Sequence, residues 1–107
     1  MPVFRVSVLR CQPQDFAGLK KMMAESMAVL EPGIRGMRGL IHFYAGEDAA
    51  TNSLANVSVW ETLADAQQLD TYRPMLDLGR EFVSKGATFE RPIMNYATQW
   101  ESAPDLR

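Results

Sequence analysis

Hydrophobic and polar residues alternate near the start of the chain and then change to a helical spacing. In VFRVSVLR, residues 3–10, β-branched residues are frequent and side chains alternate between two faces, which predicts a strand. One face of this strand holds Val3, Arg5, Ser7 and Leu9, and the other holds Phe4, Val6 and Val8. From Pro13 apolar residues recur every three or four positions, so an amphipathic helix of about five turns follows. We expect EPG, residues 31–33, to end it.

The middle of the chain has the pattern of a β-hairpin. LIHFYAG, residues 40–46, and LANVSVWE, residues 54–61, both favour strands, and the polar segment EDAATNS between them favours a turn. Thr62 is a candidate N-cap for the helical segment LADAQQLDTY, with Asp65 three positions later. Pro74 interrupts that segment and suits the first turn of a new helix over residues 74–86.

The last element, TFERPIMNYATQW, residues 88–100, completes the order β-α-β-β-α-β, and Pro92 within it indicates an edge position or a bulge. This order predicts one α+β domain over residues 1–107, with a ferredoxin-like four-stranded antiparallel sheet. Two helices can cover only one face of that sheet. Because both faces carry apolar side chains, we expect a second copy of the chain to cover the other, giving a homodimer.

A polar and aromatic cluster is expected on one sheet face. If the hairpin turn is centred in EDAATNS, the residue numbers of two partners across the hairpin add up to about 102. His42 then lies opposite Trp60, and Tyr44 lies opposite Ser58. Together with Asn56 these side chains mix apolar bulk with hydrogen-bonding groups, as small-molecule pockets do. Val57 and Val59 would then point to the other face. Each member alone also has an ordinary structural explanation, such as a core tryptophan or a hydrogen-bonded histidine.

Charge and composition exclude several classes of function. Lys and Arg number 11 against 13 acidic residues, and the net charge of -2 gives no electrostatic footprint for nucleic acid. With one cysteine, Cys11, and one histidine, His42, the chain has neither an intrachain disulfide nor a Cys/His zinc site. No apolar run approaches ~20 residues and no signal-peptide layout begins the chain, so we expect a cytoplasmic protein without a membrane span.

A family resemblance rests on three features, namely the stretch NVSVWETLADAQQL, the terminal FERPIMNY and the order of elements. Over nearly its whole length the chain resembles the antibiotic biosynthesis monooxygenase domain family, whose fold is the dimeric α+β barrel. Members that oxygenate polycyclic phenols or quinols have an asparagine four residues before the tryptophan and an arginine twenty after it. Those positions are Asn56, Trp60 and Arg80 here.

The resemblance implies a monooxygenase that uses dioxygen without metal, flavin or other cofactor. A phenol, anthrone or quinol is deprotonated, its anion passes an electron to dioxygen, and recombination gives a quinone. Asn56 would hold the substrate oxygen, Trp60 would be a flat wall and a donor, and Arg80 would stabilise the anion. From residue chemistry we add His42 as proton acceptor, and the expected pocket adds Tyr44 and Ser58 as substrate contacts.

Two other functions remain open from the sequence. One is a non-enzymatic dimer that binds a small molecule in the same barrel, and the other is an isomerase or lyase that acts through His42 without oxygen. Heme degradation is disfavoured because the relatives that perform it bind iron through a histidine on the second helix, where this chain has none. The seven methionines suggest adaptable cavity walls or ordinary core packing.

Overall fold

The computed structural model describes residues 1–104, so the last three residues of the expected 1–107 domain lie outside the described residues. The strands are β1 (Val3–Arg10), β2 (Leu40–Asp48), β3 (Ser53–Trp60), β4 (Thr88–Phe89) and β5 (Met94–Ala97). The helices are α1 (Pro13–Arg35), α2 (Leu63–Ala66) and α3 (Arg73–Ser84), with short 3-10 turns η1 (Ala49–Thr51) and η2 (Gln67–Thr71).

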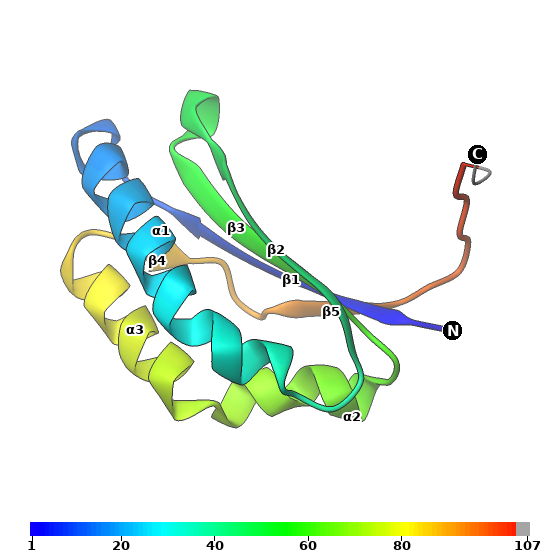
Figure 1. The fold of residues 1–107 in the computed structure, drawn as a ribbon. Coiled ribbons are helices and arrows are strands. Elements are labelled where there is room, and N and C mark those ends of the chain that lie inside the picture. Colours follow the sequence, from blue (N-terminus) through cyan, green and yellow to red (C-terminus); the bar gives the residue numbers. More distant parts are fainter. Residues whose placement is uncertain (105–107) are drawn as a thin grey trace.

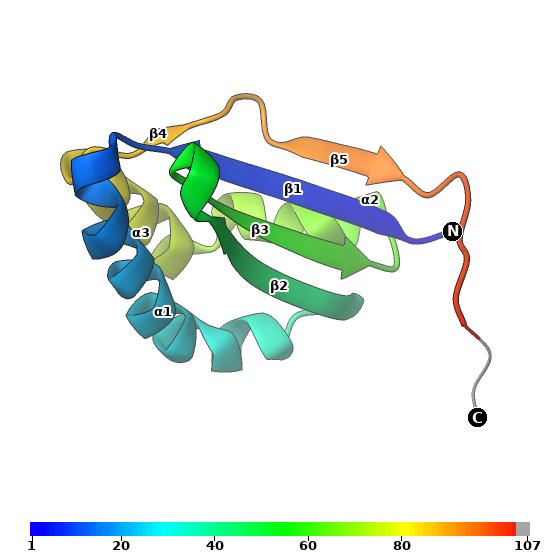
Figure 2. The same ribbon diagram turned by 90° about the horizontal axis from the view of Figure 1, so that it is seen from above.

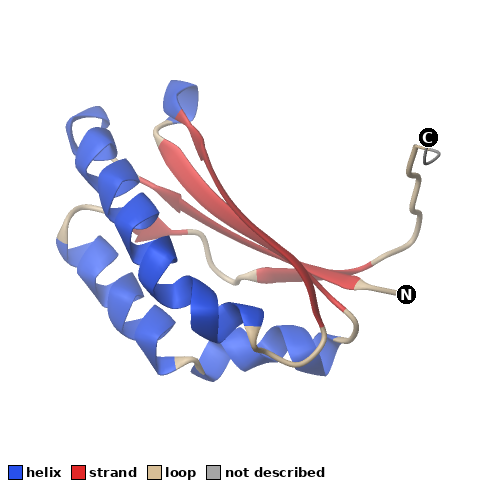
Figure 3. Cartoon of the chain, in the orientation of Figure 1, coloured by secondary structure: helices blue, strands red, loops and turns tan. Residues whose placement is uncertain are grey.

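The strands form one antiparallel sheet in the order β2-β3-β1-β4, and β5 also pairs with β1. Figure 1 and Figure 3 show all the helices except η1 on one side of this sheet, which we call the helix face. The opposite side, the open face, is turned toward the reader in Figure 2. The predicted ferredoxin-like fold is confirmed. The predicted terminal strand is divided into β4 and β5 at the outer edge, and Pro92 lies in the gap between them.

Helix α1 is longer than the sequence pattern predicted. EPG does not end it, because the helix continues through Pro32 to Arg35. A proline in the last turn removes a single backbone hydrogen bond. Leu30 and Ile34, four positions apart on one side of the helix, are both buried in the core, and their packing offsets that loss.

The predicted register of the hairpin is wrong by one residue. Phe43 lies opposite Ser58 and Ala45 opposite Asn56, so the pairs sum to 101 and not 102. The turn explains the difference. Its four residues end in Asn52, which adopts a left-handed conformation with φ of 50°, and Asp48 accepts a hydrogen bond from the backbone N–H of Ala50. A one-residue shift moves every side chain of a strand to the other face.

Two groups of buried side chains hold the helices against the sheet. The first surrounds Trp60, which has no exposed surface and packs with Leu30, Ile34 and Leu69. The indole Nε1–H of Trp60 donates to the hydroxyl oxygen of Ser58 at 2.8 Å, so the one polar atom of the ring is satisfied inside the core. The second group is formed by Leu9, Leu19, Met23, Leu54, Phe82 and Ala87.

The start of α2 is fixed by a small polar network. Thr62 is the N-cap, as the sequence predicted, and its hydroxyl accepts from the backbone N–H of Asp65 at 3.1 Å. The buried carboxylate of Asp65 accepts from Arg38 Nε at 2.7 Å. Gly39 has φ of 77° and lies against this carboxylate so closely that a Cβ would collide with it. The network therefore ties the beginning of β2 to the segment that follows β3.

Asp65 should make stability depend on pH. The hydrogen bond from Arg38 is the main cause that lowers the pKa of Asp65 below its usual 3.8. A lowered carboxyl pKa contributes stability above the unfolded value, and that contribution is lost as pH falls through the folded value. We expect Asp65→Asn to be less stable than wild type near neutral pH, with a difference that shrinks from about pH 5 downward. Urea unfolding at a series of pH values measures this, with Glu101→Gln in the exposed tail as control. A difference independent of pH would contradict it.

Candidate functional site

A cavity of about 520 Å³ lies between the helix face of the sheet and the helices α1 and α3. We call it the sheet–helix cavity. Its volume falls in the range of small-molecule sites, roughly 300–1,000 Å³. Most of its wall is apolar and includes three of the methionines, Met23, Met27 and Met75, together with Phe82 and Phe89. The expectation of methionines in a cavity wall is therefore confirmed for these three.

The strands contribute polar side chains to the floor of this cavity. Ser7 of β1 lies directly opposite Asn56 of β3, and Arg5 lies opposite Ser58. Arg5, Ser7 and Asn56 all line the cavity. Arg5 and Asn56 are diagonal neighbours on the same face, a relation with Cα atoms about 7–8 Å apart and within reach of long side chains. The cavity thus has a polar floor and largely apolar walls.

Arg5 is the most deeply placed charge in the cavity. Its side chain is 4% exposed, and its Nη2 donates to Asp70 Oδ1 at 2.9 Å, while the Asp70 side chain on η2 is 51% exposed. Two floor atoms are buried without a hydrogen-bond partner among residues 1–104, namely Arg5 Nε and Asn56 Oδ1. Buried polar atoms are nearly always paired, so an unpaired donor and an unpaired acceptor on two residues that line one cavity are exceptional.

Arg80 lines the cavity from α3, but not as the sequence reading required. Its side chain is 73% exposed and its Nη1 donates to Asp77 Oδ1 at 3.1 Å, one turn earlier on the helix. Arg91 also lines the cavity, and its guanidinium lies 5.0 Å from the centre of the Phe89 ring. Arg80 therefore belongs to the mouth of the cavity, where water screens its charge.

Trp60 and Ser58 are on the helix face with Asn56, as predicted, but they do not line the cavity. Both side chains are fully buried and hydrogen-bond to each other. The expected grouping of Asn56, Trp60 and Arg80 around one cavity is thus met by Asn56 and Arg80, while Trp60 lies behind the wall in the core.

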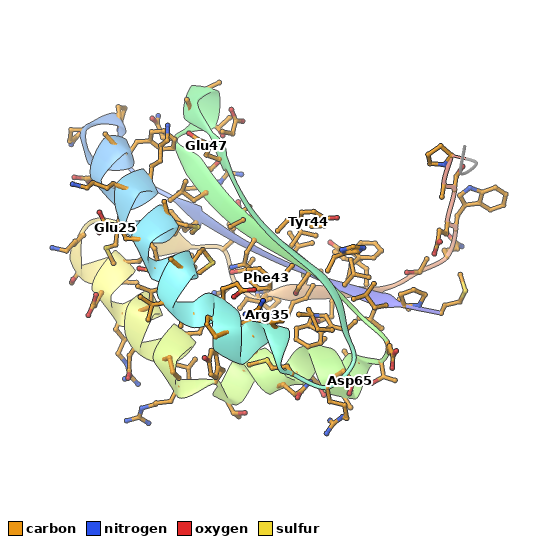
Figure 4. All side chains as sticks on the ribbon, viewed as in Figure 1. Glu25, Arg35, Phe43, Tyr44, Glu47 and Asp65 are labelled. Carbon is orange, nitrogen blue, oxygen red and sulfur yellow. The ribbon has the colours of Figure 1, made fainter. Side chains whose placement is uncertain are left out.

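His42 and Tyr44 lie on the open face, so the prediction that they share a face with Asn56 is wrong. His42 is opposite Val59 and Tyr44 opposite Val57, and the two rings stack 5.7 Å apart. Figure 4 shows Phe43 directed toward α1 and Tyr44 directed away from the helices. His42 instead borders a separate hollow of about 340 Å³ between α1 and β2. The shifted hairpin register is the physical reason.

Comparison with solved structures identifies the fold, whereas comparison of sequences finds no match. No protein-family profile matches the chain, and no curated protein matches it. Among solved structures, Rv0793 from Mycobacterium tuberculosis has a TM-score of 0.69 at 16% identity and covers 96% of this chain and 100% of its own. The chain shares its fold with solved structures described as candidate antibiotic biosynthesis monooxygenases.

Two further solved structures share this fold. SnoaB, a cofactor-independent oxygenase from Streptomyces nogalater, has a TM-score of 0.66 at 15% identity and covers 97% of this chain and 98% of its own. A candidate antibiotic biosynthesis monooxygenase from Deinococcus radiodurans has a TM-score of 0.67 at 12% identity, and covers 98% of each chain. The resemblance to the antibiotic biosynthesis monooxygenases is thus confirmed in the fold, over nearly the whole chain.

Sequence reasoning missed Arg5 and Ser7 as cavity residues. A signal was present, because both belong to the same face of the first strand as Val3 and Leu9, which are buried in the core. A charged residue between buried positions of an alternating strand must point inward with them. Only a cavity or a polar partner makes such a position tolerable.

Residues 1–104 contain neither a metal-binding cluster nor a membrane-spanning helix. In this range no three His, Cys, Asp or Glu side chains are arranged so that they could hold a metal ion. Within the same part of the chain, no helix combines the length and apolar character needed to cross a membrane.

Proposed function

We propose that the protein is a cofactor-independent monooxygenase that uses dioxygen to oxidise an electron-rich phenol, anthrone or quinol bound in the sheet–helix cavity. The observation that carries the proposal is Asn56, whose buried Oδ1 has no partner among the described residues and which lines a cavity with largely apolar walls. The shared fold with SnoaB, described as a cofactor-independent oxygenase, supports it.

The proposed reaction requires few catalytic groups from the protein. Oxidation of a substrate CH₂ or aromatic C–H to a carbonyl consumes one dioxygen, places one oxygen atom in the product and releases the other as water. The carbanion or phenolate form of the substrate supplies the electrons. Apolar walls keep the aromatic ring flat against them and limit competing water, and Asn56 orients the substrate oxygen. Arg80 at the mouth attracts anionic substrates, and Trp60 acts through packing behind the cavity wall.

Asn56→Ala should lower the turnover of a demonstrated substrate. Loss of one hydrogen-bond donor to an oxyanion, here the Nδ2 amide of Asn56, typically costs about 10²–10³-fold in kcat. A screen of hydroquinones, anthrones and phenols in an oxygen electrode, with no added cofactor, identifies the substrate. Labelled dioxygen should then place one heavy oxygen atom in the product. Asn95→Ala on β5, exposed at the sheet edge, is the matched control. Equal turnover in Asn56→Ala and wild type would remove Asn56 from the site.

A non-enzymatic binding protein would use the same cavity, and one result separates it from an oxygenase. A ligand that raises the melting temperature but is recovered unchanged after prolonged aerobic incubation would favour binding without reaction. An isomerase acting through His42 has less support, because that side chain is on the other face of the sheet from Asn56.

A homodimer formed through the open face is part of the proposal. Residues 4–8 of β1, 42–46 of β2 and 55–59 of β3 supply its centre, and their open-face positions include no Asp, Glu, Lys or Arg. Phe4 stacks on Tyr96 at 5.4 Å between ring centroids, and Tyr96 and Met94 are each 44% exposed. An apolar sheet face without charges is suited to a second copy of itself.

A further inference from the structure

We infer that Arg5 is the cationic group that binds the oxygen of an aromatic hydroxyl in the sheet–helix cavity and favours its ionised form. The inference rests on the proposed use of this cavity as the substrate site, and it assigns to Arg5 the role of anion stabiliser that the family resemblance would give to Arg80.

The geometry favours Arg5 over Arg80. Arg5 Nε is buried and unpartnered among residues 1–104, whereas Arg80 is 73% exposed and paired with Asp77. A charge in a low-dielectric setting acts several times more strongly on a nearby anion than the same charge in water. The deep guanidinium is therefore the one able to shift the ionisation of a bound ligand.

Asp70 fixes the guanidinium without consuming all its donors. It accepts from Nη2 at 2.9 Å, and the Nε donor has no partner among residues 1–104. The charged side chains that line the cavity are Arg5 from β1, Asp70 from η2, Arg80 from α3 and Arg91 from the segment before β5. With Asp77, the partner of Arg80, also counted, three positive charges stand against two negative charges, which leaves the cavity a net preference for an anion.

Arg5 and Asn56 together match a hydroxyl group. Arg5 Nε–H is a donor and Asn56 Oδ1 is an acceptor, and the two do not hydrogen-bond to each other. A phenolic oxygen can accept from the first while its proton is donated to the second. When that proton is released to solvent water, the contact with Arg5 becomes a charge-assisted hydrogen bond, which is roughly twice as strong as a neutral one. Arg5 thus lowers the pKa of the ligand hydroxyl without a protein base, which fits a site that His42 does not reach.

The test uses 4-nitro-1-naphthol, whose ionised form absorbs visible light and which is too electron-poor to be oxidised by dioxygen. Its pKa when bound is read by absorbance titration with protein in excess. In wild type we expect a bound pKa about 1–3 units below the value in water, as for an acid beside an arginine. Arg5→Met should abolish this lowering, and Arg80→Met should change it by less than about half a unit because its charge is screened.

A second variant is expected to shift the bound pKa in the opposite direction from Arg5→Met. It keeps the test decisive if Arg5→Met does not fold. Asp70→Asn removes the counter-ion from Arg5 and should lower the bound pKa further. Circular dichroism and probe affinity confirm that each variant is folded and binds. A bound pKa that is the same in wild type and Arg5→Met, or that rises in Asp70→Asn, would overturn the inference. Because the probe does not react, these results are independent of whether the protein oxygenates anything.

Discussion

Trp60→Ala should lower the free energy of unfolding by about 3–5 kcal/mol, the usual cost of removing a buried tryptophan side chain. The indole is fully buried among Leu30, Ile34 and Leu69, so no rearrangement of a surface loop can fill the space. The free energy of unfolding of a native protein is roughly 5–15 kcal/mol in total, so the variant is expected to lose a large part of its stability. Urea denaturation followed by circular dichroism measures the change.

Trp60→Phe separates packing from a catalytic role of the indole. It keeps a buried ring but leaves the Ser58 hydroxyl without its 2.8 Å donor, which should cost about 1–3 kcal/mol. In the double variant with Ser58→Ala, both polar partners are gone, and we expect part of that loss to be recovered. If Trp60 acts by packing alone, Trp60→Phe keeps the turnover number of wild type. If Trp60→Phe instead loses turnover while its stability is unchanged, the indole of Trp60 takes part in catalysis.

Val57→Glu should convert the proposed homodimer into a monomer. Val57 is in the middle of the open face, between Val6 on β1 and Tyr44 on β2. A two-fold interface presents the substituted residue from both copies, so two unpaired carboxylates would be buried, each at a cost of several kcal/mol. We expect the dissociation constant to rise by at least about a hundredfold, which corresponds to roughly 2.7 kcal/mol. Light scattering coupled to size-exclusion chromatography measures the mass across a range of concentrations.

Val29→Glu is the matched control for the dimer. Val29 is on α1 and is 80% exposed, so the same change of side chain falls outside the proposed interface and should leave the dimer intact. The dimer proposal fails if wild type is monomeric at micromolar concentration, or if Val57→Glu and Val29→Glu have the same mass.

Asn56 and Trp60 were correctly assigned to one face of their strand because alternation along a single strand depends only on the chain itself. His42 and Tyr44 were assigned wrongly because their face depends on how two strands pair, and that pairing depends on the length and shape of the turn. One residue in the turn was enough to change the result. The same limit applies to Arg80, whose position on α3 was predictable while its partner Asp77 and its exposure were not.

The sequence by itself determined the order of strands and helices, the cap at Thr62 and which residues share a face in β1 and in β3, because these follow from local spacing and local hydrogen bonds. Only the tertiary structure decided the hairpin register, the length of α1 past Pro32, the burial of Trp60 away from the cavity and the place of Arg5 in its floor. Each of these depends on contacts between residues far apart in the chain. The hydrogen bond between Arg5 and Asp70 is an example, because 65 positions separate the two residues in the chain. No local pattern links them before the sheet and helices have packed.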